Sequence, residues 1–211
     1  MNICGIDPGL NGGLAFINSG VLKLYPMPVI GGKDYDIQEI KRILETERPG
    51  FTVLENQIAM PGQGLTSTLQ TGKGFGILLG LLAGMNFPYQ VIGAKQWQTK
   101  LFTGVKGSLD TKDKSEVIAK RLFPTADFRK SDRARVAHDG LTDAACIAEY
   151  GRRIYSQGAD PVSGMPHVSN PMNPDVCVVC GAYLPTADPN DCKKPLYETP
   201  DSTFKTSVGG L

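Results

Sequence analysis

Three short apolar runs separated by turn residues open the chain and predict an antiparallel meander. The runs are NICGID (residues 2–7), LAFIN (14–18) and VLKLYPM (21–27). Proline and glycine lie between the first two runs and a Ser-Gly pair between the last two, as is typical of tight strand connections. The first strand therefore ends on the carboxylate of Asp7. A phosphate-binding Walker loop does not fit here, because no lysine precedes Lys23 and a strand follows the glycines.

Helical apolar spacing alternates with strand-like runs further along the chain. Further strands are predicted over 51–55 (FTVLE) and 89–94 (YQVIGA), and helices over 34–47, 66–86, 111–123 and 141–155. Residues 95–110 have an irregular, basic pattern, and 127–140 have the pattern of a charged loop. This order predicts an α/β domain in which helices flank a mixed sheet.

Glycine recurs at every fourth position of the helix predicted over 66–86. The four positions are Gly72, Gly76, Gly80 and Gly84. Glycine inside a helix costs up to about 1 kcal/mol relative to alanine, so such a stripe indicates a close approach by backbone, a partner subunit or a ligand.

The composition changes after the last predicted helix, where Pro, Asn, Asp and Gly dominate. We expect one domain over residues 1–157, a linker over 158–174 and a small irregular tail over 175–211. The tail contains a C-x2-C pair, which is suggestive of a structural zinc module, and a disordered tail with unrelated cysteines is the alternative. The candidate zinc ligands are His167, Cys177, Cys180 and Cys192.

Charge is distributed unevenly although the net charge is only +1. Residues 95–135 contain eleven Lys and Arg against five Asp and Glu, and acidic segments flank them. A basic block beside clustered acids indicates a polyanionic partner, with a solvated basic face as the alternative. The chain shows no secretory signal, and its longest apolar run is too short to span a bilayer, so we expect a cytoplasmic protein without a membrane partner.

Four acidic residues end or begin predicted elements. Asp7 and Glu55 end two strands, and Asp139 and Asp143 lie four residues apart at the start of the last helix. Parallel pairing of the two strands would bring Asp7 and Glu55 together, and carboxylates that converge in this way need hard cations such as Mg²⁺ or Mn²⁺. Two such ions about 4 Å apart would activate water against a phosphodiester. Each acid also has a structural alternative as a turn residue, a helix cap or a strand end.

Four ordered blocks of the sequence resemble the RuvC-type Holliday junction resolvases of the RNase H-like superfamily, and their phage-type and plant chloroplast members in particular. The blocks are GIDPGLNGGLAF, VLENQ, the run GFGILLGLLAG…YQVIGAKQWQ…TKDKSEVIAKRLFP, and HDGLTDAACIAEYG. Over about residues 1–155 the resemblance implies an RNase H-like nuclease domain with a five-stranded mixed sheet. It further implies a homodimer that binds a four-way DNA junction and nicks two opposed strands with Mg²⁺, leaving 5′-phosphates, with no nucleotide cofactor.

The resemblance also assigns roles to residues. It implies that two metal ions per site are bound by Asp7, Glu55, Asp139 and Asp143. Lys112 of TKDKS matches a lysine near the scissile phosphate. RuvC spaces its last two ligands three residues apart. Asp139 and Asp143 are four apart, as in the chloroplast branch, which has histidine at the position of Asp139. His138 is adjacent, so either residue can face the metal; helix register favours Asp139.

The basic block supplies candidate DNA contacts, which position the duplex without reading its sequence. They are Lys95, Lys106, Lys114, Arg129, Lys130 and Arg133, together with Lys73 in the loop-like TGKGFG. Phe75 and Trp97 are candidates for stacking on opened bases, with a place in the core as the alternative.

Three other functions compete with a junction-resolving nuclease. A binding protein would keep the fold without cleavage, although carboxylates facing phosphate would weaken it. An RNase H acting on RNA-DNA hybrids would share the chemistry but not the TKDKS and HDGLTDA context. An actin-like or sugar-kinase-like ATPase needs two such cores, and 211 residues accommodate one.

Overall fold

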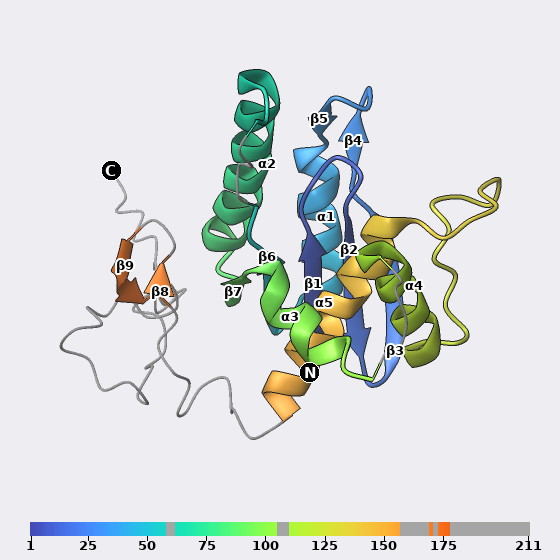
Figure 1. The fold of residues 1–211 in the computed structure, drawn as a ribbon. Coiled ribbons are helices and arrows are strands. Elements are labelled where there is room, and N and C mark those ends of the chain that lie inside the picture. Colours follow the sequence, from blue (N-terminus) through green and yellow to red (C-terminus); the bar gives the residue numbers. More distant parts are fainter. Residues whose placement is uncertain (58–61, 105–109, 157–168, 171–172, 178–211) are drawn as a thin grey trace, which may run out of the picture. The chain divides into compact units, whose positions relative to one another are not determined.

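The structure is a computed structural model that describes residues 1–57, 62–104, 110–156, 169–170 and 173–177 (Figure 1). The chain divides into two compact units, Met1–Ala159 and Asp160–Leu211. In the second unit, the described residues form an antiparallel pair of strands, β8 (Ser169–Asn170) and β9 (Asn173–Cys177).

The first unit is built on a five-stranded mixed sheet with the order β3-β2-β1-β6-β7. Its strands are β1 (Ile3–Asp7), β2 (Gly13–Asn18), β3 (Val21–Pro26), β6 (Phe51–Glu55) and β7 (Tyr89–Ile92). The first three strands form the predicted antiparallel meander, and β6 is parallel to both β1 and β7. The predicted mixed sheet is confirmed.

One face of the sheet packs against α1 (Ile37–Glu47) and α2 (Leu65–Gly84). Alternate residues of β1 and β2 point to this side, and the core there consists mainly of Cys4, Ile6, Leu14, Phe16, Leu54, Ile40, Ile43, Leu44, Leu78 and Leu82. Asp36 caps α1 by accepting a hydrogen bond from the Glu39 amide at 3.0 Å.

The opposite face packs against α5 (Asp139–Ser156), with α3 (Ala94–Leu101) and α4 (Thr111–Leu122) beside it (Figure 1). Gly5 permits this contact, because a Cβ there would lie 2.2 Å from the backbone nitrogen of Ala148. Phe51 contributes to the same face, and its ring centroid lies 4.2 Å from that of Tyr155.

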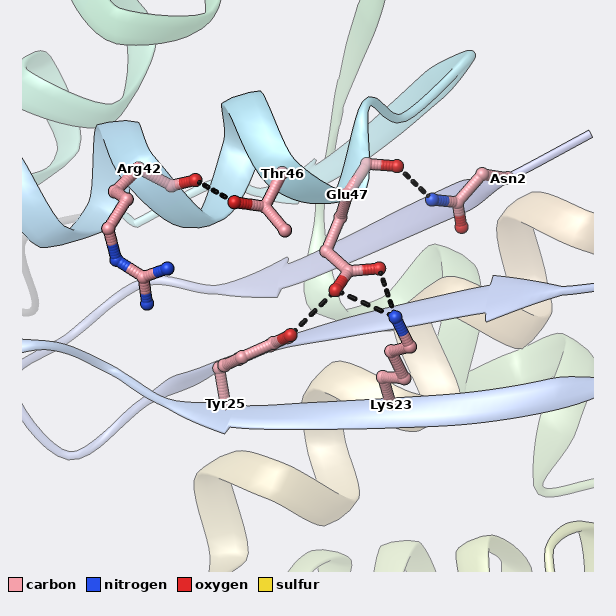
Figure 2. A network of polar contacts seen from close by, with 6 residues as sticks. All are labelled: Asn2, Lys23, Tyr25, Arg42, Thr46 and Glu47. Atoms are coloured by element: carbon pink, nitrogen blue, oxygen red, sulfur yellow. Dashed lines mark hydrogen bonds and ion pairs between the residues drawn. The ribbon is translucent and has the colours of Figure 1, made fainter.

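A polar network attaches the end of α1 to β3 (Figure 2). The Glu47 carboxylate accepts hydrogen bonds from the Tyr25 hydroxyl at 2.6 Å and from the Lys23 ammonium at 3.0 Å. The Asn2 side-chain amide donates to the Glu47 carbonyl. Burial and the neighbouring Glu47 carboxylate raise the pKa of Tyr25 to about 12, so this hydroxyl stays a donor at neutral pH.

The structure corrects the predicted elements at two places. Residues 94–101 form the helix α3 rather than an irregular segment, because Trp97 and Leu101 are four apart and both are buried. Residues 34–35 form β5 (Asp34–Tyr35), paired with β4 (Val29–Ile30), instead of the first turn of α1.

The glycine-rich helix also differs from expectation. The stretch TGKGFG lies inside α2 and is not a loop. A Cβ at any of the four stripe glycines would meet no atom within 4 Å among the described residues, so the stripe faces away from the core. None of the described helices is both long and apolar enough to cross a bilayer.

Candidate active site

The sheet brings Asp7 and Glu55 to adjacent strand ends. β1 and β6 are parallel and Ile6 pairs with Leu54, so the next residue of each strand is a carboxylate at the same edge. Side chains alternate along a strand, which places Asp7 and Glu55 on the face that α5 covers. The predicted pairing is therefore confirmed.

Close backbone contact places the start of α5 over this edge. A Cβ on Gly140 would lie 2.2 Å from the carbonyl oxygen of Asn11, so only glycine fits beside the β1–β2 turn. The His138 carbonyl accepts from the Leu141 and Thr142 amides and begins the helix. Asp139 and Asp143, one helical turn apart, consequently face the sheet end that carries Asp7.

The acids perturb one another's pKa values. Burial and the negative charges of Asp143, Glu55 and Asp139 hold the pKa of Asp7 well above its ordinary value. Burial and the Asp143 charge raise the pKa of Glu55, and burial raises the pKa of Asp143 to about 6, with Asp139 adding to the effect. The site concentrates negative charge that the protein alone does not neutralise.

These carboxylates fit a hard divalent cation. Oδ1 of Asp143 is buried without a hydrogen-bond partner, and carboxylate oxygens are the ligands that Mg²⁺ and Mn²⁺ prefer. As they stand, no three His, Cys, Asp or Glu side chains among the described residues are arranged to hold an ion. Asp139 is paired with Lys112 and Glu55 with Trp97.

Lys112 extends from the first turn of α4 toward the acids. Its ammonium lies 2.7 Å from Oδ2 of Asp139, and hydrogen bonding to that carboxylate raises the pKa of Lys112. Lys112 is therefore charged at neutral pH and largely exposed, so it can exchange its carboxylate partner for a phosphate.

The sequence left open whether His138 or Asp139 faces the site, and both residues line the cleft. Burial and the charge of Lys130 lower the pKa of His138, so its ring is neutral at neutral pH, and its Nδ1 is buried without a partner. The Asp139 charge acts on both Asp7 and Asp143, which places Asp139 near the other acids.

Two residues that the sequence did not single out hold the turn after Asp7. The Gly9 amide donates to the Tyr35 hydroxyl at 2.9 Å, and the Gln57 side-chain amide donates to the Pro8 carbonyl. Gln57 lies within the VLENQ block and could have been found there, whereas Tyr35 is in a hairpin that the sequence did not predict.

An open cleft of about 760 Å³ lies over these residues. Its lining combines the acids Asp7, Asp139 and Asp143 with Lys112 and with polar residues of α2, among them Gln70 and Thr71. Such a cleft has room for an extended ligand above the acids.

The candidate DNA contacts are distributed around the unit rather than gathered in the cleft. Lys95, Lys130 and Arg133 are exposed and Lys114 is half-buried, while Lys106 lies outside the described residues. The exposed Arg129 is held by Asp127 at 2.6 Å, and Lys73 pairs with Asp34 on β5. Lys130 lies near the rim, because its charge lowers the His138 pKa.

The two stacking candidates are packed against protein instead. Trp97 is 1% exposed, so its ring cannot stack on a base in this structure, and the core alternative is correct. Phe75 is half-buried and packs against the core beneath α2.

The candidate zinc site stays a prediction. His167, Cys180 and Cys192 lie outside the described residues, and Cys177 is the last residue of β9. The proposed boundaries of linker and tail also stay predictions.

Solved structures share this architecture. RuvC of Thermus thermophilus, determined in complex with a Holliday junction substrate, aligns with 74% of this chain and 95% of its own, at 16% identity and a TM-score of 0.52. The yeast mitochondrial Holliday junction resolvase Ydc2 aligns over 74% of this chain and 79% of its own, at 16% identity and a TM-score of 0.50. The sequence matches no protein-family model and no curated protein. The chain therefore has a RuvC-like fold, and the expected five-stranded mixed sheet flanked by helices is confirmed.

Proposed function

We propose that this protein is a metal-dependent endonuclease that resolves four-way DNA junctions. The observation that carries the proposal is the convergence of four carboxylates at one end of the sheet, three of which line one cleft together with Lys112, on a RuvC-like fold. A protein that only bound DNA would gain nothing from uncompensated acids facing phosphate.

The residues that would hold two Mg²⁺ or Mn²⁺ ions are Asp7, Glu55, Asp139 and Asp143. When bound, the ions would supply an activated water and stabilise the leaving oxygen of the phosphodiester. Lys112, released from Asp139, would donate to a non-bridging phosphate oxygen and stabilise the charge that develops there. Cleavage in this mode leaves a 5′-phosphate and a 3′-hydroxyl.

Resolution requires two nicks, so we further propose that the protein acts as a homodimer. The open glycine stripe of α2 is the candidate dimer face, because glycines at every fourth position let two helices approach closely. Exposed lysines and arginines such as Lys95, Lys130 and Arg133 would contact the phosphate backbone.

The test uses labelled four-way junctions, matched duplex and RNA-DNA hybrid, each in Mg²⁺ and in EDTA. Wild type should nick opposed junction strands symmetrically, and EDTA or Asp7→Asn should abolish the nicks. Asp34→Asn, which removes an exposed acid outside the cleft, should cleave like wild type. Tight junction binding without cleavage would favour a non-catalytic binding protein, and faster cleavage of the hybrid would favour an RNase H activity.

A further inference from the structure

Trp97 contacts the candidate metal site directly. Its indole nitrogen, Nε1, donates a hydrogen bond to Oε1 of Glu55 at 2.8 Å. The ring is 1% exposed, so water does not compete for this bond at the indole. The chain contains no other tryptophan.

The helix that carries Trp97 is fixed at its start. Gly93 precedes α3: its amide donates to the Gln96 side chain at 2.7 Å, and its carbonyl accepts from the Gln96 amide at 2.9 Å. The Phe102 ring stands edge-on to the indole, with centroids 5.5 Å apart and planes at 84°. The indole N–H is therefore held by packing on a short, capped helix.

The other acids of the site are held differently. Asp7 is the last residue of β1 and has a short side chain, and Asp139 is paired with the exposed Lys112. A glutamate at a strand end has three rotatable side-chain bonds, so its carboxylate needs an external partner to keep one orientation.

We propose that Trp97 is a positioning residue for Glu55: its N–H fixes one carboxylate oxygen and leaves the other for the metal. The inference rests on the proposed function. An indole suits this role because it only donates, stays neutral and is no metal ligand, whereas a lysine would neutralise the charge that attracts the cation. Replacing a residue that hydrogen-bonds to a metal ligand typically weakens metal affinity about 10- to 100-fold.

Because the chain has one tryptophan, replacing every tryptophan by 3-benzothienylalanine changes only Trp97. This analogue keeps the bicyclic shape and replaces N–H by sulfur, so packing stays and the donor disappears. We expect Mn²⁺ binding, measured by calorimetry without DNA, to weaken about tenfold or more. In cleavage assays the half-saturating Mg²⁺ concentration should rise equally, while the rate at saturating Mg²⁺ and junction affinity in EDTA stay near wild type.

Phe16→Leu is the matched control, because it removes an edge-on aromatic contact, with Tyr25, in the core on the other face of the sheet and leaves the contacts of Trp97 unchanged. It should bind Mn²⁺ like wild type. Trp97→Phe is a second donorless variant, and its Mn²⁺ affinity should match that of the analogue. Unchanged Mn²⁺ affinity in the analogue protein, with wild type binding and cleaving normally, would overturn the positioning role alone. Failure of wild type to bind Mn²⁺ more tightly than Asp7→Asn would overturn the proposed metal centre itself.

Discussion

The ammonium of Lys112 on α4 lies 2.7 Å from the carboxylate of Asp139 in the first turn of α5. Both side chains are more than half exposed, so the pair is screened by water and separates readily. Under the proposed function, separation of this pair would free Lys112 for the phosphate and Asp139 for the metal.

Lys112→Met should reduce junction cleavage at saturating Mg²⁺ by about 100- to 1,000-fold, the usual effect of removing one donor to a developing oxyanion. Junction affinity should change less than threefold, because a single exposed lysine contributes little to backbone binding. Lys120→Met on the same helix, where Lys120 pairs with Glu116, is the control and should cleave normally. Single-turnover cleavage and binding isotherms separate the two quantities, and a loss in binding alone would make Lys112 an ordinary phosphate contact.

Asp139→Asn and His138→Ala should differ in metal binding. We expect at least tenfold weaker Mn²⁺ binding for Asp139→Asn, since the Asp139 charge reaches both Asp7 and Asp143. His138→Ala should retain Mn²⁺ affinity, because Asp139 lies one helical turn before Asp143, whereas His138 precedes the helix and lies off that face. Calorimetry without DNA measures the Mn²⁺ affinity of both variants. Weaker binding by His138→Ala than by Asp139→Asn would make His138 the ligand.

Asp143→Asn should stabilise the metal-free protein at pH 8. The pKa of Asp143 in the folded protein is about 6, above its ordinary 3.8, so its protonated form favours folding and this contribution is lost as the pH rises through 6. The variant should gain on the order of 2 kcal/mol at pH 8 and little below pH 4.

Urea unfolding in EDTA across this pH range measures the difference. Asp34→Asn should show the opposite sign, because the neighbouring Lys73 lowers the pKa of Asp34. Saturating Mg²⁺ should reverse the ranking of wild type and Asp143→Asn, since only the intact site binds the cation tightly. A gain for Asp143→Asn that is independent of pH would mean that the buried, ionised carboxylate of Asp143 is not its cause.

Sequence patterning predicted the elements that depend on local periodicity. The meander and the buried strand before Glu55 have strict apolar patterns, so their strand ends, and with them Asp7 and Glu55, were predictable. The spacing of Asp139 and Asp143 on one helix followed in the same way.

Contacts set by the tertiary fold were not predictable in this way. Trp97 lies in a lysine-rich stretch with only two buried positions, so neither α3 nor its bond to Glu55 had a local signal. The hydrogen bond from the Gly9 amide to Tyr35 depends on a two-residue strand that pairs only within the folded chain. The glycine spacing of α2 predicted a close approach, whereas a Cβ on any stripe glycine would meet no atom within 4 Å among the described residues.

That outward stripe leads to the test of dimerisation. The stripe glycines would let a second helix approach closely, and no atom of the described residues lies within 4 Å of a Cβ built at any of the four positions. Gly76→Leu should therefore convert a dimer into a monomer in sedimentation velocity at micromolar concentration. Gln38→Leu, at an exposed position of α1, should stay dimeric.

The junction assay connects this result to function. Monomeric Gly76→Leu should bind Mn²⁺ like wild type, because the acids lie on β1, β6 and α5 and not on the stripe. Its nicks on opposed strands should become uncoupled, so that singly nicked junctions accumulate. If Gly76→Leu is stable, dimeric and resolves junctions normally, the protein must use another face, and α2 would then contact a different partner or DNA.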